Sequence, residues 1–288
     1  MLGAKARGND GAAGLRAWIP LAPFFLFALA FEVLPILMLA RSSLIVDGGL
    51  SVSNFGRALT PTMMAAFRNS IQVSFITAFL GVVLGTTVAY AIVTTRSTAV
   101  QSALTALADV TANFGGAPLA FAFIITLGST GFVTLLLQTA GVDLYPTFRI
   151  YSVGGLTVAY LYFQLPLLIL LIIPALHGLR REWREAATSL GASTTQYWLR
   201  VGLPILAPSL LGSFLLLFAN SFGAYATAWT LTGSDVNLIT VQIAALVRGE
   251  VQLDPALADA LALMSLGFMA ICVAGYQWLA SRTRRASP

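Results

Sequence analysis

The chain carries the sequence REAATSLG at residues 184–191 and, after nine further residues, the sequence VGLP at residues 201–204. This charged region lies between two long apolar runs. Charged residues that interrupt apolar runs lie where a membrane-embedded body meets water. The stretch therefore predicts a helix bundle in a bilayer with a structured loop at its surface.

Local signals predict that this loop is an elbow made of two short helices. Glu182 and Glu185 lie in the first turns of the expected first helix, where carboxylates favour the positive end of the helix dipole. Gly191 is typical of the left-handed residue that ends a helix. Ser193, followed three residues later by Gln196, predicts a capping box that starts a second helix at once.

One face of the first elbow helix, expected over about residues 180–190, carries apolar and small side chains. Trp183, Ala187 and Leu190 fall at positions i, i+4 and i+7 and share a face with Ala186. Two adjacent alanines let the surface of a partner approach the backbone closely. This face is therefore expected to dock against another protein.

The composition excludes an ordinary soluble domain. Hydrophobic residues make up 58% of the chain and charged residues 9%, whereas about a quarter of the residues of a soluble domain are charged. The sequence pI near 9.7 could suggest nucleic acid, but the arginines do not cluster on one polar domain, so no nucleic-acid partner is expected. The single cysteine, Cys272, lies in an apolar run and cannot form an intrachain disulfide.

The fold class expected is all-α, a polytopic membrane helix bundle with about six transmembrane helices and the elbow on its cytoplasmic side. Spans of about twenty apolar residues are needed to cross a bilayer. They are expected near residues 18–40, 69–95, 101–127, 152–176, 204–231 and 257–280. One transmembrane domain is expected over 18–281, with the coupling loop at 178–203 and cytoplasmic tails at 1–17 and 282–288.

The distribution of basic residues predicts the orientation of this bundle. Eleven lie on one side of the layout: Lys5, Arg7, Arg16, Arg96, Arg180, Arg181, Arg184, Arg200, Arg282, Arg284 and Arg285. Five lie on the other: Arg41, Arg57, Arg68, Arg149 and Arg248. By the positive-inside rule, both termini and the elbow are cytoplasmic.

Three connections are expected on the external side. Residues 42–68 are expected to form a loop. Residues 132–137 and 236–247 are apolar but too short to span. The first of these is interpreted as a re-entrant or interfacial turn packed on the mouth of the bundle, and the second as an interfacial helix. Plain loop packing is the alternative for both.

The chain lacks the residues that two common catalytic motifs require. Its single lysine, Lys5, lies in a polar tail, so no Gly-Lys-Ser/Thr phosphate loop exists. Its single histidine is His177, so no His-Glu-x-x-His metal site exists. We therefore expect no catalytic residue, no metal and no cofactor, and any ATP must be hydrolysed by another protein.

Polar residues inside the spans mark candidate pathway positions, because bundles bury polar groups toward interfaces or water-filled paths. Three stripes contain larger polar residues: Ser209, Ser213, Asn220 and Thr227 on the fifth span; Ser102, Thr105, Asp109, Asn113 and Gly116 on the third; and Thr157, Tyr160 and Gln164 on the fourth. The candidates for the translocation pathway are Asp109, Asn113, Gln164, Ser213, Asn220 and Thr227. Interhelical hydrogen bonding is the alternative for each of them.

The second span carries a different stripe, which consists of small residues only. Its members are Ser70, Ser74, Thr77, Gly81 and Gly85. Such a stripe indicates close helix packing. Glu32 in the first span stands alone, and either a neighbouring side chain or the external half of a cavity would suit it.

The spacing of the elbow resembles the signature cytoplasmic loop of permease subunits of ATP-binding-cassette importers. That signature reads Glu-Ala-Ala, three residues, Gly, nine residues, then Ile-x-Leu-Pro, and here Val replaces the commoner Ile. The positions that fill it or flank it are Glu185, Ala186, Ala187, Leu190, Gly191, Val201, Leu203 and Pro204. The resemblance implies that the elbow is a coupling helix that docks in a groove of an ATPase subunit. The alternative is an ordinary helical hairpin between two membrane helices.

The resemblance also implies partners and a location. It implies a cytoplasmic ATPase dimer, a second permease that is either a copy or a relative, an external solute-binding protein, and a bacterial inner membrane as the surrounding lipid bilayer. The layout around Asn54-Phe55, residues 127–131 and residues 178–180 is similar to spermidine/putrescine-type permeases. Iron(III), thiamine and phosphonate importers share it, so they are the alternatives for the solute.

Two functions of another class remain open from the sequence alone. An ion-coupled secondary carrier would need intramembrane carboxylates, for which Asp109 and Glu32 are the candidates. A membrane scaffold that transports nothing would use the polar stripes for packing only.

Overall fold

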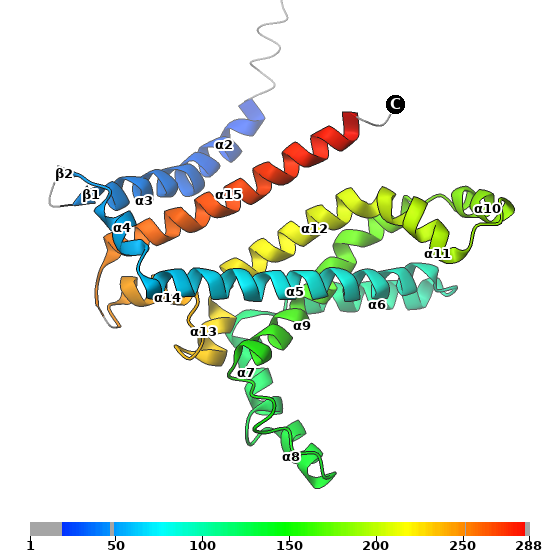
Figure 1. The fold of residues 1–288 in the computed structure, drawn as a ribbon, viewed down its shortest axis with the longest axis horizontal. Helices are drawn as coiled ribbons and strands as arrows, with labels where there is room; N and C mark the ends of the chain where they lie inside the picture. Colours follow the sequence, from blue (N-terminus) through cyan, green and yellow to red (C-terminus); the bar gives the residue numbers. More distant parts are fainter. Residues whose placement is uncertain (1–18, 47–48, 251, 286–288) are drawn as a thin grey trace, which may run out of the picture.

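The structure, a computed structural model, describes residues 19–46, 49–250 and 252–285. Helices dominate it, which confirms the all-α prediction (Figure 1). The N-terminal third comprises η1 (Ile19–Leu21), α2 (Ala22–Ala28), η2 (Leu29–Val33), α3 (Leu34–Leu44), β1 (Ile45–Val46), β2 (Gly49–Leu50), α4 (Ser53–Ala58) and α5 (Pro61–Thr94). The expected N-terminal tail, with Lys5, Arg7 and Arg16, lies outside the described residues.

The remainder of the chain contains the other helices of the bundle. They are α6 (Thr98–Ala112), α7 (Gly116–Leu127), α8 (Phe132–Thr139), α9 (Val153–His177), α10 (Arg181–Ser189), α11 (Thr194–Tyr197), η3 (Trp198–Gly202), α12 (Leu203–Gly223), α13 (Ala226–Thr232), α14 (Ile239–Arg248) and α15 (Pro255–Arg285). The C-terminal residues 282–285, expected in a tail, continue α15.

In the described part of the chain, six helical stretches are long and apolar enough to cross a membrane. They are Ala22–Leu44, Pro61–Thr94, Gly116–Thr139, Val153–His177, Thr194–Gly223 and Pro255–Trp278. The number agrees with the prediction, but the bounds differ. The second stretch begins at residue 61 rather than 69, because Pro61 takes the first helical position, where its missing N–H costs nothing.

The third and fifth predicted spans are interrupted in the structure, so the prediction of one continuous helix over 101–127 and over 204–231 was wrong. The third breaks after α6, where Gly116 adopts a positive φ of 72°. The fifth leaves the helical conformation at Ala224, with a ψ of 104°, and resumes as the short helix α13. Apolar periodicity continues through both breaks, which is why it did not reveal them.

The helix α9 lies at the centre of the packing and contacts α5, α6 and α12. Its partner α5 supplies the predicted stripe of small residues, all five of which are buried. A Cβ added at Gly81 would lie 2.8 Å from Cδ2 of Leu217, and one added at Gly85 would lie 2.7 Å from Cδ2 of Leu168. The stripe therefore allows close helix packing, as predicted.

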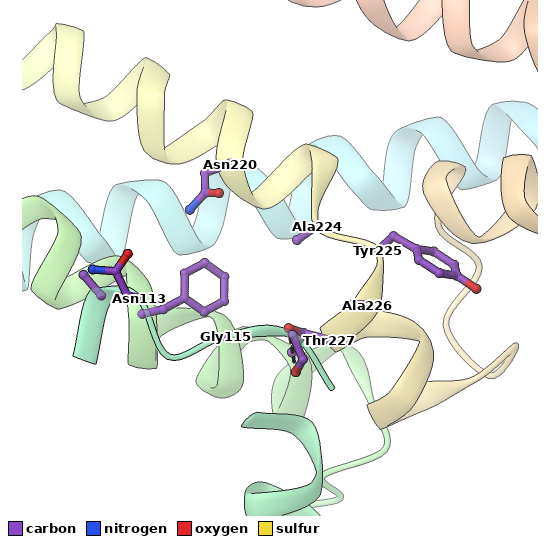
Figure 2. Close-up of a pocket in the computed structure, with 10 residues that line it drawn as sticks. Asn113, Gly115, Asn220, Ala224, Tyr225, Ala226 and Thr227 are labelled. Carbon is purple, nitrogen blue, oxygen red and sulfur yellow. Dashed lines mark hydrogen bonds between the residues drawn. The ribbon is translucent and has the colours of Figure 1, made fainter. Parts of the chain in front are cut away.

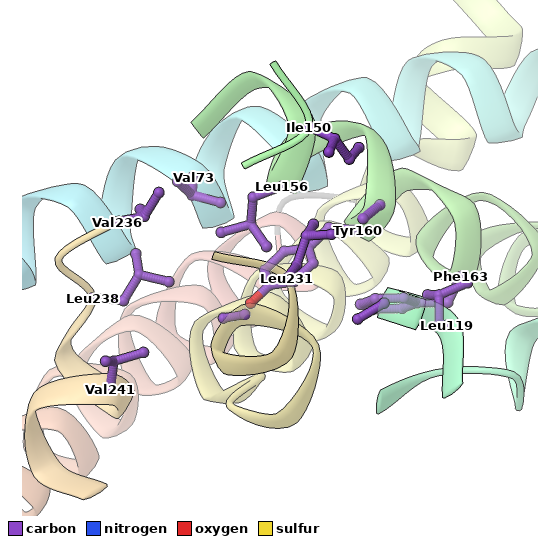
Figure 3. Packing of buried hydrophobic residues seen from close by; sticks show 13 residues of the cluster. Val73, Leu119, Ile150, Leu156, Tyr160, Phe163, Leu231, Val236, Leu238 and Val241 are labelled. Atoms are coloured by element: carbon purple, nitrogen blue, oxygen red, sulfur yellow. The ribbon is translucent and has the colours of Figure 1, made fainter. Parts of the chain in front are cut away.

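A buried cluster joins α9 to the segments beyond the two breaks. Figure 3 shows Tyr160 and Leu156 of α9 beside Leu231 of α13, with Leu238 and Val73 also in this cluster. Because these residues come from α5, α9, α13 and the loop before α14, the cluster fixes the second half of the broken fifth span against the central helices.

The external connections differ from the loops expected. Residues 42–68 contain the end of α3, an antiparallel pair of two-residue strands and α4 before α5 begins. The segment 236–247 does form a helix, α14, and it packs on α15 and α5. By contrast α8, which covers the predicted turn at 132–137, follows α7 and projects beyond the end of α7 that packs on α13, so it does not pack on the mouth of the bundle (Figure 1).

The two ends of the bundle differ in what they carry. The elbow helices α10 and α11 lie at one end, beside the turn between α5 and α6 (Figure 1). The strands, α4 and α14 lie at the opposite end. The first membrane stretch runs along α15, and its most apolar window contains no buried residue.

Candidate functional site

The elbow has the geometry that the sequence predicts. The helix α10 ends at Ser189, and Gly191 adopts a φ of 77°. The amide of Gly191 donates to the carbonyl of Thr188 at 2.9 Å, and the amide of Ala192 donates to the carbonyl of Ala187 at 2.9 Å. This pair of bonds is the Schellman arrangement that closes a helix with a left-handed residue.

The capping box at the start of the second elbow helix is also present. The side chain of Ser193 accepts from the amide of Gln196 at 3.2 Å, and the side chain of Gln196 accepts from the amide of Ser193 at 2.8 Å. The helix then runs through the π-turn η3 and the residue Pro204 into α12 without a break. The whole stretch Thr194–Gly223 is 30 residues long, which corresponds to a rod of about 45 Å.

The expected docking face of α10 is exposed, except for one residue. Leu190 exposes 88% of its surface and Trp183 exposes 38%, and Ala186 is exposed beside them. Ala187 is half-buried. Glu185 forms an ion pair with Arg181 at 2.8 Å on the surface.

Three further predicted coupling residues lie where the elbow joins the long rod. Val201 is half-buried, whereas Leu203 and Pro204 are exposed. Between them Gly202 is buried against the ring of Trp198, where an added Cβ would lie 2.5 Å from Cε3. A close contact therefore holds this part of the rod against the aromatic residue of its own preceding turn.

The second candidate site is a cavity of about 280 Å³ between the two helix breaks. Its lining comprises Ala112, Asn113, Gly115, Gly116, Phe163, Asn220, Ala224, Tyr225, Ala226 and Thr227. Figure 2 shows Asn220 extending from α12 toward the segment that carries Asn113 and Gly115. Amide and hydroxyl side chains therefore line the cavity, together with the residues at the two helix breaks.

Two hydrogen bonds from distant elements hold the breaks in place. The hydroxyl of Tyr160, on the central helix α9, donates to the carbonyl of Ala224 at 2.8 Å. The hydroxyl of Thr227 donates to the carbonyl of Gly116 at 3.2 Å and so joins one break to the other. The carbonyl of Ala224 follows the last residue of α12, where a helix leaves carbonyls without an internal partner, so the first bond satisfies it.

The structure brings together three of the six predicted pathway residues. Asn113, Asn220 and Thr227 line the cavity. Asp109 is exposed on α6, one turn before Asn113, whose side chain donates to the carbonyl of Asp109 at 2.8 Å. Ser213 is buried on α12 outside the cavity.

Gln164, the remaining predicted pathway residue, lies inside the bundle, away from the cavity. It is fully buried, and its amide donates to the carbonyl of Leu217 at 3.0 Å. Interhelical hydrogen bonding was the alternative to pathway lining that the sequence analysis gave for Gln164, and this bond is of that kind. The place of Gln164, Ser213 and Asp109 in a pathway remains a prediction.

Five lining residues were missed from the sequence. None of them carries a charge, and three are small: Ala112, Gly115, Phe163, Tyr225 and Ala226. The adjacent pairs Gly115-Gly116 and Gly223-Ala224 were the available signal, because glycine within a helical pattern lowers the confidence of a continuous helix.

Residues 144–285 match the family model described as binding-protein-dependent transport system inner membrane component. The chain belongs to this family. The matched residues include α9, the elbow, both sides of the break at Ala224, and α15. The family is a transport component, in agreement with the expectation that this chain is not itself the ATPase.

Several members of this transport family are similar over part of the chain. The ferric transport system permease protein of Actinobacillus pleuropneumoniae is 30% identical over 55% of this chain, and the thiamine transport system permease protein of Escherichia coli is 28% identical over 58%. The molybdenum transport system permease protein of Mycobacterium bovis is 28% identical over 61%. The alignments span 23%, 30% and 64% of the length of these relatives, respectively.

Solved structures of transporters share the fold. One of them is a chain of a bacterial ABC transporter involved in the import of the acidic polysaccharide alginate. It superposes on the present chain with a TM-score of 0.75 at 15% identity, and the superposition covers 95% of the present chain and 98% of the transporter chain. A chain of the MetNI methionine ABC transporter in an inward-facing conformation gives a TM-score of 0.52 at 18% identity, covering 79% and 99%.

Proposed function

We propose that this chain is the transmembrane permease subunit of an ATP-binding-cassette importer, that the cavity between the helix breaks belongs to its solute pathway, and that the elbow receives force from a separate ATPase. The observation that carries this proposal is the uninterrupted rod Thr194–Gly223. One end of the rod begins at the exposed elbow, and the other end carries Asn220 and stops at the cavity.

The exposed face of α10 supports the position of the ATPase in this proposal. Leu190 and Trp183 expose apolar surface at the tip of the molecule, where a partner groove would cover it. In this arrangement the chain works with a second permease, identical or related, and with an external solute-binding protein. The elbow and both termini face the cytoplasm of a bacterial cell, as the distribution of basic residues predicts.

The lining of the cavity supports passage of a small hydrophilic solute. None of its ten residues is charged, and they offer two amide side chains, a threonine and a tyrosine. Such a lining can replace part of the hydration of a solute without holding it tightly. The choice of solute would then fall mainly on the binding protein.

For the solute itself, we propose the group named by the relatives rather than a polyamine. The relatives described above are named for ferric, thiamine and molybdenum transport, and others for sulfate. The spermidine/putrescine expectation finds no support in these names, whereas its iron and thiamine alternatives do. An uptake panel of ferric iron, thiamine, molybdate, sulfate and spermidine in reconstituted vesicles would separate them.

The two broken helices also invite comparison with ion-coupled carriers, in which discontinuous helices form the ion and substrate sites. A carrier of that kind needs a carboxylate or an equivalent ligand at the break. Neither break contributes an acidic side chain to the cavity, since Asp109 lies outside its lining. The importer is therefore the better-supported proposal.

Cysteine crosslinking tests the importer proposal directly. In a Cys272→Ser background, Ala186→Cys and Leu190→Cys should each crosslink to a co-purified ATPase that carries a phosphate-loop motif. Val142→Cys, on the exposed connection after α8, is the matched control and should not crosslink. Failure of both elbow positions to capture an ATPase would refute the coupling role, and so would labelling of Leu190→Cys from the outside of intact cells.

A further inference from the structure

A second cavity, of about 180 Å³, lies at the elbow end of the bundle. Its walls come from the ends of α5 and α9, from α10 and from the start of the long rod. Arg180, Arg181 and Arg184 line one part of it, while Tyr90 and Trp198 line another. It therefore combines positive charge with aromatic and apolar surface in one small space.

The guanidinium groups of this cavity are only partly neutralised. Arg181 pairs with Glu185 at 2.8 Å. Arg184 donates to the hydroxyl of Tyr90 at 3.2 Å, and the guanidinium carbon of Arg180 lies 5.8 Å from the ring centre of Trp183. Among the ion pairs of the described residues, neither Arg180 nor Arg184 has a carboxylate. The cavity is thus left with two guanidinium groups that can bind an anion.

The arginines on α10 lie on the opposite side of the helix from the exposed docking face. At about 100° per residue, Arg181 projects about 180° away from Leu190, and Arg184 about 120° away. Ala187, the half-buried residue of α10, lies about 60° from both Leu190 and Arg184, at the boundary between the two sides. An ATPase bound to Ala186 and Leu190 would therefore leave the arginine side of α10 toward the membrane.

An exposed apolar stripe leads from the middle of α5 to this cavity. Phe75, Phe79 and Val83 expose 52%, 53% and 47% of their surface. At helical spacing they fall within an arc of about 80° that also contains Tyr90. The distance along the helix from Phe75 to Tyr90 is about 22 Å, which exceeds the thickness of one hydrocarbon leaflet, about 15 Å.

We propose that this cavity binds the phosphate headgroup of an anionic phospholipid, with an acyl chain lying along the exposed stripe of α5. Arginine forks match phosphate oxygens, and basic pockets between membrane helices on the cytoplasmic side suit anionic headgroups. Trp198 and Tyr90, whose rings pack edge to face at 5.1 Å, supply the amphipathic aromatic surface typical of the membrane interface. The proposal rests on the proposed function in one respect, the cytoplasmic position of the elbow.

Trp198 provides a reporter inside the cavity. The chain has five tryptophans, so a variant that keeps Trp198 and replaces the other four by phenylalanine gives one emission signal. This chain is reconstituted into nanodiscs of phosphatidylcholine with increasing mole fractions of brominated phosphatidylglycerol or brominated phosphatidylcholine. Half-maximal quenching should need a several-fold lower fraction of the anionic lipid.

The variants Arg180→Gln and Arg184→Gln should each reduce this preference about fivefold, which corresponds to about 1 kcal/mol per basic residue at the membrane surface. Arg200→Gln is the matched control, because Arg200 is exposed on η3 and does not line the cavity. Unchanged quenching by brominated phosphatidylcholine shows that each variant keeps its fold.

Four outcomes would overturn the proposal. They are equal quenching by both lipids in the unaltered cavity, an unchanged preference in the two variants, a loss as large in Arg200→Gln, and reversal of the quenching by free inorganic phosphate. A separate titration with the ATPase added gives a fifth outcome that would overturn the proposal: loss of the preference there would assign the arginines to the ATPase. The titration without the ATPase uses the permease chain alone, so its failure is distinguishable from failure of the elbow crosslinks.

Discussion

The bend at Gly191 allows a quantitative test of the elbow. Its φ of 77° lies in the left-handed region, and a Cβ added there meets no atom within 4 Å. Substitution therefore changes the backbone preference without a steric clash. An L-residue other than glycine pays about 1–2 kcal/mol in this conformation, so Gly191→Ala should lower the equilibrium constant for closing the bend about 5–30-fold.

Two hydrogen bonds report the opening of this bend. The amides at positions 191 and 192 donate to Thr188 and Ala187 in the closed elbow. Hydrogen exchange measured by mass spectrometry on a peptide covering 188–197 should therefore accelerate about 5–30-fold in Gly191→Ala. Gly191→Asn should show a smaller increase, because asparagine tolerates the left-handed conformation better.

Gly223→Ala is the matched control for this series. Gly223 has open space around its Cβ position and no positive φ, so alanine should leave the elbow peptide unchanged. In reconstituted vesicles, Gly191→Ala should lose more ATP-driven uptake than Gly191→Asn. Wild-type exchange and wild-type uptake in Gly191→Ala would refute the argument that this bend shapes the coupling surface.

Three further substitutions test the packing and the local bonds. Gly85→Val should destabilise the bundle by about 1–3 kcal/mol, because its Cβ would meet Leu168, and should lower the unfolding temperature in detergent by several degrees. Tyr160→Phe should cost about 1 kcal/mol by leaving the half-buried Ala224 carbonyl without its donor, measured in the same way. Ser193→Ala removes the cap of the second elbow helix and should cost about 1 kcal/mol, measured as roughly fivefold faster exchange in residues 194–197.

Each of these substitutions has a control in the chain. Gly275→Val places the same side chain where no atom lies within 4 Å, so an equal shift there would exclude a packing effect at Gly85. Tyr162→Phe alters a partly exposed tyrosine on the same helix as Tyr160 and should leave stability nearly unchanged. Ser189→Ala changes an exposed serine at the end of α10, and faster exchange in that variant would contradict the role of the cap.

The elbow was predictable because its determinants are local. A left-handed glycine and a capping box act over at most six residues, so both partners of each interaction lie close together in the sequence. The helix bounds, the positive φ at Gly191 and the reciprocal bonds of Ser193 and Gln196 follow the prediction. The buried stripe on α5 was predictable for a similar reason, since small residues at helical spacing allow close approach.

The sequence by itself determined an all-helical membrane chain, its number of membrane-crossing stretches and its elbow, because hydropathy and capping depend on neighbours along the chain. Only the tertiary structure decided where two apolar runs break and which polar residues meet there. The carbonyls of Gly116 and Ala224 find their donors on Thr227 and Tyr160, which lie 111 and 64 residues away in the sequence. No local pattern encodes a hydrogen bond of that range, so the cavity exists only once the helices have packed.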